Sequence, residues 1–140
     1  MTTDMKHTPH IQEMYAAFGR GDVPAILKRL HPDVLWAANV DFTLPAARAV
    51  PCYESGRGHD FVARYFGLFA QSYEVHEFQI LSFMEGGNEV AVRLIVDVTI
   101  RRTARRIRGE IIHHYTLNED GLVTRFLDIE DTLGFSHAWA

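Results

Sequence analysis

The chain lacks the features that mark secreted and membrane-spanning proteins. Cys52 is its one cysteine among 140 residues, which excludes an internal disulfide framework and a cysteine-rich zinc site. No apolar run approaches the roughly 20 residues that cross a bilayer. The opening residues, MTTDMKHTPH, have no apolar stretch of the kind found in a signal peptide. We therefore expect a soluble cytoplasmic protein without a membrane partner.

Positive charge is also scarce. Lysine and arginine total 14 against 18 aspartate and glutamate residues, so the formal net charge is −4 with the eight histidines neutral. A protein of this charge has no global positive field that would attract nucleic acid. We therefore expect no nucleic-acid partner.

What remains is the composition of an ordinary globular domain. Hydrophobic residues make up 47% of the chain and charged residues 23%, close to globular averages. A chain of this length forms one domain. Because Pro9 ends a segment without apolar periodicity, we predict a flexible tail over residues 1–9 and a single domain over residues 10–140.

Helical patterns dominate the first half of the sequence. Residues 11–18 carry apolar side chains at positions i, i+3, i+4 and i+7, which predicts a first helix. Asp22 is suited to capping a second helix, which ends at the sequence HPD before a short strand at residues 34–36. A third helix is predicted over residues 60–72. It follows an irregular segment at residues 38–58 that we interpret as a pocket rim or lid.

The second half of the sequence changes to the period of two that is typical of strands. Turn residues separate the strands, and residues 101–106 and 118–121 are the last two predicted turns. A run of helices followed by a run of strands predicts an α+β fold, with the helices on one face of an antiparallel sheet. The predicted strands span residues 74–84, 90–101, 107–117 and 122–130.

Several stretches resemble a known family. The sequences YAAFGRGD (residues 15–22) and LHPDVLW (residues 30–36) are similar to the start of nuclear transport factor 2-like proteins of the SnoaL-like and ketosteroid-isomerase-related branch. The sequences GNEVAV (residues 87–92) and DGLVTRFLDIEDT (residues 120–132) are similar to its closing half. The resemblance extends over residues 11–135.

This resemblance implies a cone-shaped α+β fold, in which three N-terminal helices pack on a curved, mainly antiparallel sheet and enclose a pocket. The family includes steroid isomerases, polyketide cyclases, limonene epoxide hydrolases and non-catalytic binding proteins. The fold therefore leaves the activity open, and the pocket residues must decide it.

The resemblance also indicates which polar residues matter. Asp97 and Asp128 match the two catalytic aspartates of the epoxide hydrolases, but Ile95 stands where those enzymes have an arginine. The steroid-isomerase base falls at Ala38, so that activity lacks its base. Polyketide cyclases use an aspartate and a histidine from the late strands, for which Asp128 and His113 are the counterparts.

The register of the predicted hairpins brings the same residues together. With residues 101–106 and 118–121 as loops, Asp97, Ile111 and Asp128 form one row across three strands, and His113 shares their face. We therefore predict that Asp97, His113 and Asp128 all point into the cavity between sheet and helices. Burial and mutual repulsion should then raise the pKa of at least one of the two acids.

The strand at residues 90–101 has two different faces, which leaves two interpretations. Its face of alternating valines would ordinarily pack in the core, with Arg93 and Asp97 in solvent. The resemblance implies the reverse, because the polar face would then line the cone and the valine stripe would face outward. An exposed stripe of that size needs a cover. Following the second interpretation, we predict a homodimer through the outer face of the sheet.

The remaining candidates take their roles from the cone fold. Tyr15 is assigned as a hydrogen-bond donor to a developing oxyanion. We expect no metal site, because the adjacent strand residues His113 and His114 face opposite ways and cannot share an ion. We also expect no cofactor. The five arginines between residues 101 and 108 form either a solvated turn or a site for an anionic partner. The predicted pocket-lining residues are Trp36, Tyr65, Arg93, Ile95, Ile111 and Phe126.

Two functional hypotheses follow. The first is a cofactor-independent isomerase, cyclase or lyase acting on a small apolar carbonyl compound. In it Asp128 is the base or acid, His113 its partner and Asp97 a tuning carboxylate. The second is a non-catalytic module, which binds a small apolar ligand or serves in dimeric assembly.

Overall fold

The protein is described from a computed structural model, which covers residues 5–140. Five α-helices and one 3₁₀ turn accompany six strands in these residues. The helical elements are α1 (Thr8–Gly19), α2 (Val23–Leu27), α3 (Pro45–Arg48), η1 (Pro51–Tyr53), α4 (His59–Ser72) and α5 (Thr132–Trp139). The strands are β1 (Leu30–Ala38), β2 (Gly56–Arg57), β3 (Tyr73–Gly86), β4 (Glu89–Ile100), β5 (Arg105–Leu117) and β6 (Val123–Ile129).

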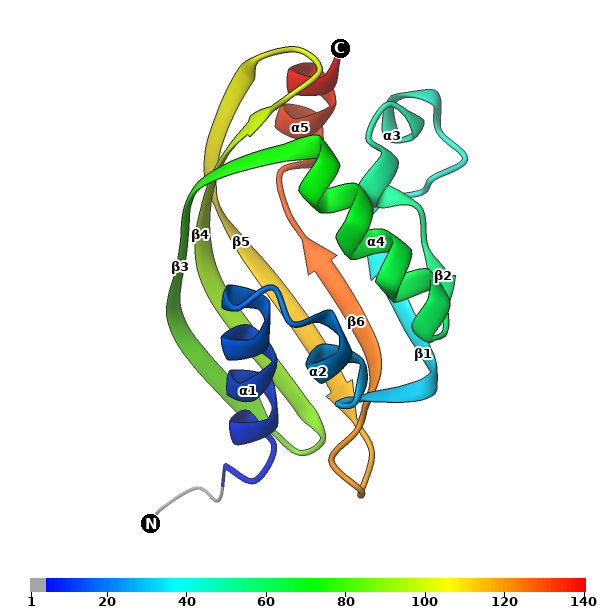
Figure 1. The fold of residues 1–140 in the computed structure, drawn as a ribbon, viewed down its shortest axis with the longest axis vertical. Coiled ribbons are helices and arrows are strands. Elements are labelled where there is room, and N and C mark those ends of the chain that lie inside the picture. Colours follow the sequence, from blue (N-terminus) through cyan, green and yellow to red (C-terminus); the bar gives the residue numbers. More distant parts are fainter. Residues whose placement is uncertain (1–4) are drawn as a thin grey trace.

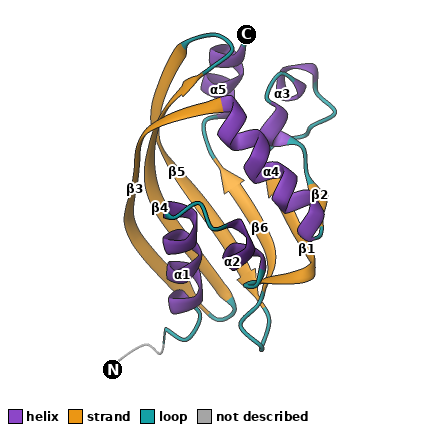
Figure 2. Cartoon of the chain, viewed as in Figure 1, coloured by secondary structure: helices purple, strands orange, loops and turns teal. Residues whose placement is uncertain are grey.

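The six strands form one sheet in the order β2-β1-β6-β5-β4-β3. Neighbouring strands are antiparallel except β1 and β6, which run parallel. The sheet is curved, and α1, α2 and α4 all lie on the same face of it (Figure 1; Figure 2). The predicted α+β fold, with helices packed on a mainly antiparallel sheet, is confirmed.

Helix α1 begins inside the segment that we predicted to be a tail. Glu85 of β3 accepts hydrogen bonds of 2.7–3.2 Å from the backbone N–H groups of His7 and Thr8 and from the Thr8 hydroxyl. These bonds satisfy donors that the start of a helix leaves without a partner. The rest of the predicted tail, residues 1–4, lies outside the described residues.

The turn between β4 and β5 is shorter than predicted, because only residues 101–104 form it and Ile100 pairs with Arg105. Asp97 pairs with Arg108, whereas the longer turn would have set it opposite Glu110. Since strand side chains alternate, both positions lie on the same face, opposite to that of Ile111. The prediction that put Asp97 in one row with Ile111 was therefore wrong by one residue, and an error of one residue exchanges the two faces.

The valine stripe of β4 consequently faces the helices. This corrects the interpretation that placed it outward, and it removes the exposed surface from which we argued for a second subunit. The homodimer itself stays a prediction. The stripe consists of Val90, Val92, Leu94, Val96, Val98 and Ile100, none of them more than 6% exposed.

The C-terminal helix α5 was not predicted. The Asp131 side chain caps it by accepting a hydrogen bond from the Gly134 N–H at 2.9 Å. The arginine-rich hairpin tip then holds its other end. The Thr103 hydroxyl donates to the Ala138 carbonyl at 2.7 Å, and the Arg102 guanidinium lies 5.5 Å from the centre of the Trp139 ring.

These contacts give the arginine cluster a structural role, because they satisfy carbonyl groups at the end of α5. They also fix the position of Phe135, which lines the cavity described below. No helix within residues 5–140 is long and apolar enough to cross a membrane.

We expect Thr103→Val to lower the free energy of unfolding by about 1 kcal/mol, because the Ala138 carbonyl loses its side-chain donor. Thermal and denaturant unfolding measure this change. Arg101→Ala, at the same turn but with no side-chain hydrogen bond to α5 in the described residues, is the control and should change stability much less. Equal losses of stability in the two variants would contradict a stabilising role of the hydrogen bond from Thr103 to Ala138.

Candidate functional site

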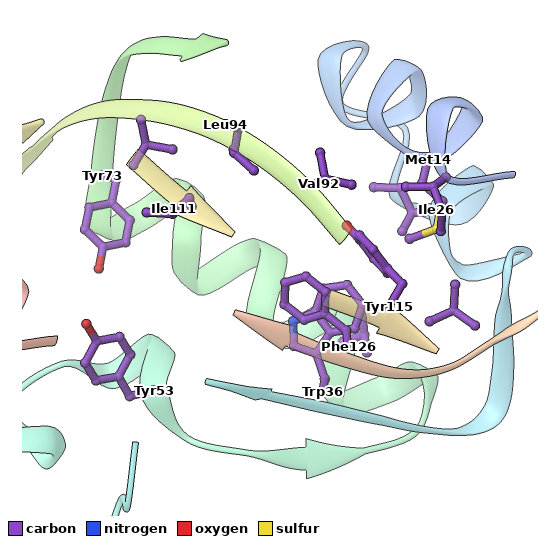
Figure 3. Packing of buried hydrophobic residues seen from close by; sticks show 14 of the residues in the cluster. Met14, Ile26, Trp36, Tyr53, Tyr73, Val92, Leu94, Ile111, Tyr115 and Phe126 are labelled. Carbon is purple, nitrogen blue, oxygen red and sulfur yellow. The ribbon is translucent and has the colours of Figure 1, made fainter. Parts of the chain in front are cut away.

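A cavity lies between the valine face of the sheet and helices α1, α2, α4 and α5. The space open to the centre of a water-sized molecule is about 90 Å³, well above the roughly 10–15 Å³ that one water needs. Most of the lining is aromatic or aliphatic, and within residues 5–140 it contains no lysine or arginine. Figure 3 shows part of this interior, with the hydroxyl groups of Tyr53 and Tyr73 facing each other. The cavity therefore suits an uncharged molecule better than an anion.

A chain of hydrogen bonds fixes the ring of His113. Tyr115 donates its hydroxyl proton to the Tyr15 oxygen at 2.9 Å, and that oxygen lies 2.7 Å from Nδ1 of His113. Because Tyr15 already accepts from Tyr115, its own proton is available to Nδ1, which leaves the ring proton of neutral His113 on Nε2. Burial lowers the pKa of His113 despite the opposing attraction of Asp128, so the ring is neutral near neutral pH.

Asp128 faces His113 from the neighbouring strand. The two residues pair directly between β5 and β6, with Nε2 of His113 3.7 Å from Oδ1 of Asp128. That separation is too long for a direct hydrogen bond. Oδ1 is buried and has no hydrogen-bond partner among the described residues. Such an oxygen is suited to accept a proton from a molecule in the cavity.

Glu130 is a candidate that the sequence analysis missed. It lines the same cavity, and its Oε2 accepts a hydrogen bond from the Tyr53 hydroxyl at 3.2 Å. Burial and then the charge of Asp128 raise the pKa of Glu130 well above its usual value, although the hydrogen bond from Tyr53 lowers it. The available signal was the spacing, because residues i and i+2 of a strand share a face.

Trp36 brings a buried donor to the cavity. Its ring stacks on Phe126 with 4.0 Å between the centroids, and the residue is 4% exposed. Its Nε1 has no hydrogen-bond partner among the described residues. Leaving a buried N–H unpaired costs about 1–3 kcal/mol, so this group is suited to bind an oxygen acceptor in the cavity.

The structure separates the predicted site residues into two groups. Tyr15, His113 and Asp128 come together on the inner face. The predicted lining residues Trp36, Tyr65, Ile111 and Phe126 surround the same cavity.

The second group lies on the outer face of β4. Arg93, Ile95 and Asp97 alternate with the inward valines, so their prediction as pocket residues is wrong. The cause is the assignment of Asp97 to the position opposite Ile111, because an error of one residue exchanges the two faces of a strand. Arg93 instead forms an ion pair with Glu110 of β5 on that face.

Asp97 belongs to an ion pair instead of an acid pair. Arg106 donates from Nε and Nη2 to the two carboxylate oxygens of Asp97, each at 2.8 Å. The hydrogen bonding and charge of Arg106 outweigh desolvation and lower the pKa of Asp97. Asp97 is therefore an ion-paired carboxylate on the outer face of the sheet, and the acid that lines the cavity together with Asp128 is Glu130.

Fold and cavity together define a small α+β pocket protein with acid/base groups at one place in an apolar interior. The sequence matches the family described as SnoaL-like domain over residues 11–126. This match covers most of the chain, so the protein belongs to the SnoaL-like family. The resemblance that the sequence indicated is confirmed. A comparison with curated proteins gives no match.

Solved structures agree on the fold. A nuclear transport factor 2-like protein from Burkholderia xenovorans is 20% identical, with all of both chains covered and a TM-score of 0.84. One of unknown function from Burkholderia pseudomallei is 23% identical, covering 96% of this chain and 97% of the other, with a TM-score of 0.81. TerC, co-crystallised with polyporic acid, is 24% identical over 95% and 97% of the chains, with a TM-score of 0.79.

The hydrogen-bond chain predicts one tautomer of His113. In ¹⁵N NMR spectra near neutral pH, Nε2 should carry the proton and Nδ1 should not, because Tyr15 donates to Nδ1. Tyr15→Phe removes that donor and should lower the free energy of unfolding by about 1 kcal/mol. A protonated Nδ1 in the wild-type protein would contradict this arrangement.

The raised pKa of Glu130 makes stability depend on pH with a definite sign. An acid that holds its proton more tightly when folded makes the fold less stable as pH rises above its ordinary pKa, here 4.5. Glu130→Gln cannot ionise, so its stability relative to wild type should increase between about pH 4 and about pH 8. Denaturant unfolding at both values measures this difference.

Glu119→Gln, in the exposed turn after β5, is the matched control. It should show little pH-dependent difference from the wild type. A Glu130→Gln variant that becomes less stable relative to the wild type over the same pH interval would contradict the predicted direction of the pH dependence.

Proposed function

We propose that the protein is a cofactor-independent acid/base catalyst that moves a proton on a small, uncharged carbonyl compound, as an isomerase, cyclase or lyase does. The observation that carries this proposal is Oδ1 of Asp128, which is buried in an apolar cavity, lies 3.7 Å from Nε2 of His113 and has no hydrogen-bond partner in the described part of the chain. A carboxylate with little solvation is a strong base toward a nearby C–H or O–H group.

Each neighbouring group has a role in this proposal. Asp128 takes the proton from the bound compound. Neutral His113, with its proton on Nε2, donates toward the reacting region and is held in that state by Tyr15. Tyr15 therefore orients His113 rather than binding the oxyanion directly, because its hydroxyl is already engaged by His113 and Tyr115.

The indole N–H of Trp36 replaces Tyr15 as the donor to the substrate oxygen. It is buried and unpaired in the same cavity, and a donor placed there before the reaction stabilises negative charge as it develops. The substrate that fits has an oxygen acceptor for Trp36, a removable proton for Asp128 and an apolar body.

The family supports this class of reaction without fixing the substrate. Similar solved structures include a candidate polyketide cyclase from Xanthomonas campestris and a candidate isomerase from Rhodopseudomonas palustris. Proton transfer on a carbonyl compound is compatible with both names.

Deuterium exchange tests the proposal without knowledge of the natural substrate. The probe is 2-tetralone, an uncharged aromatic ketone, and mass spectrometry measures deuterium uptake at its α-carbons in D₂O. The wild-type protein should accelerate uptake, and Asp128→Asn should reduce the protein-dependent rate by about 100-fold or more. Asp97→Asn, the same substitution on the outer face of a strand in the same sheet, is the matched control and should retain the rate.

Saturable binding of the ketone without accelerated exchange would favour the non-catalytic binding module. Equal losses in the two asparagine variants would contradict the assignment of Asp128.

A further inference from the structure

Tyr53 and Tyr73 come from different elements and meet at the end of the cavity beside α5. Tyr53 belongs to η1 and Tyr73 is the first residue of β3, and they are 2% and 6% exposed. Both line the cavity, and Figure 3 shows their hydroxyl groups facing each other. No hydrogen bond joins these two hydroxyls in the part of the chain that the structure describes. A ligand atom between them would therefore meet both groups.

The hydroxyl of Tyr73 has a proton to donate. Trp139 of α5 donates from Nε1 to the Tyr73 oxygen at 3.0 Å. An indole nitrogen is only a donor, so Tyr73 accepts in this bond and its own proton points elsewhere. The described residues provide no acceptor for that proton. Burial raises the pKa of Tyr73, so the hydroxyl keeps this proton near neutral pH.

The hydroxyl of Tyr53 is arranged in the opposite sense. It donates its proton to Oε2 of Glu130 at 3.2 Å. A hydroxyl oxygen has two lone pairs, so the Tyr53 oxygen can still accept a hydrogen bond. Of the two facing tyrosines, Tyr73 therefore offers a proton and Tyr53 offers a lone pair.

A ligand hydroxyl matches both of these groups. Through one oxygen atom it accepts one hydrogen bond and donates another, which neither a carbonyl nor an ether oxygen can do. A carboxylate or a phosphate is disfavoured here, because the described lining of the cavity holds no lysine or arginine to offset its charge. The two tyrosines are therefore suited to bind an alcohol or a phenol.

The tyrosine pair lies apart from the reacting groups. Tyr73 pairs with Ile100 at one end of β4, whereas His113 pairs with Val92 near the other end. A ligand that contacts both ends thus has its hydroxyl separated from its carbonyl by an apolar body. The cavity wall between these two levels of the sheet includes Val96, Val98 and Ile111.

Contacts outside the cavity hold Tyr73 in place. Its ring packs edge-to-face on the Trp139 ring, with 5.8 Å between the centroids. The Arg102 guanidinium lies over that same indole, so the arginine-rich turn supports the group that orients the Tyr73 hydroxyl. A donor fixed in this way loses less conformational entropy on binding a ligand than a mobile one does.

We propose that Tyr73 and Tyr53 form a specificity subsite for a hydroxyl group at the far end of the substrate, which makes the substrate a hydroxylated ketone with an apolar body. Tyr73 donates to this hydroxyl and Tyr53 accepts from it. The proposal rests on the proposed function, which places the reacting carbonyl beside Asp128 and Trp36.

The experiment compares 2-tetralone with its 6-hydroxy and 7-hydroxy derivatives, in which the added hydroxyl lies across the ring system from the carbonyl. Isothermal titration calorimetry gives the dissociation constant of each ketone. The wild-type protein should bind at least one hydroxy derivative about tenfold more tightly than 2-tetralone. Tyr73→Phe should lose this preference, because the buried hydroxyl of the ligand would have no donor.

Tyr115→Phe is the matched control, since it makes the same substitution in the same cavity at the His113 end. It should leave the ratio of the two dissociation constants unchanged, whatever its effect on either ketone alone. The ratio separates a specificity role of Tyr73 from a structural one, because a distorted cavity would weaken the binding of both ketones alike.

If Tyr73→Phe does not fold, the wild-type protein labelled with ¹³C at the ζ-carbon of tyrosine still decides the question. The preferred hydroxy ketone should shift the Tyr73 signal saturably, and 2-tetralone should shift it much less. Equal shifts with the two ketones would count against the subsite.

Equal affinities for all three ketones in the wild-type protein, or a preference that survives Tyr73→Phe, would overturn the proposal. Its failure is distinguishable from failure of the proposed function, because binding is measured without turnover. If Asp128→Asn retains deuterium exchange while Tyr73→Phe loses the preference, the catalytic assignment is wrong and the subsite stands. If Asp128→Asn abolishes exchange while Tyr73→Phe keeps the preference, the subsite is wrong and the catalytic assignment stands.

Discussion

The register between β4 and β5 is the constraint on which the rest of the structure depends. A four-residue turn at residues 101–104 sets Leu94 opposite Ile111 and Val92 opposite His113. The valine stripe is thereby turned toward the helices, and the charged side chains of β4 are turned outward. Because β6 pairs His113 with Asp128, the same register carries both polar residues into the apolar interior. A shift by one residue would bring Asp97 inside and leave the cavity without its aliphatic wall.

Electrostatics inside the cavity follow from that placement. Among the residues that the structure describes, the interior receives two carboxyl groups and one imidazole but no lysine or arginine. Burial lowers the pKa of His113 and raises that of Glu130. Outside the sheet, Arg106 lowers the pKa of Asp97 through a direct ion pair. Two aspartates in one sheet thus differ in their chemistry because one has a cation beside it and the other has an acid.

The sequence was sufficient to predict the fold and to place His113 and Asp128 on one face of the sheet. Helical and strand periodicities, together with the resemblance, correctly predicted the α+β architecture and brought His113 and Asp128 to one face. Arg93, Ile95 and Asp97 were misplaced because Asp97 was set opposite Ile111, and an error of one residue in the register exchanges the two faces of a strand. Glu130 was missed because only the first acid of this segment, Asp128, was considered as a site residue. Helix α5 was missed because its capping residue, Asp131, follows the last strand almost directly. Cytoplasmic localisation and the homodimer stay predictions.

The central claim is that an uncharged carbonyl compound binds beside Asp128 and not beside Asp97. The most direct measurement is the change in the ¹³C carboxyl signals of all aspartates and glutamates when 2-tetralone is added to the protein. The account predicts a saturable change at Asp128 and Glu130, with the Asp97 signal unmoved. A saturable change centred on Asp97, or saturable binding that leaves Asp128 and Glu130 undisturbed, would contradict it.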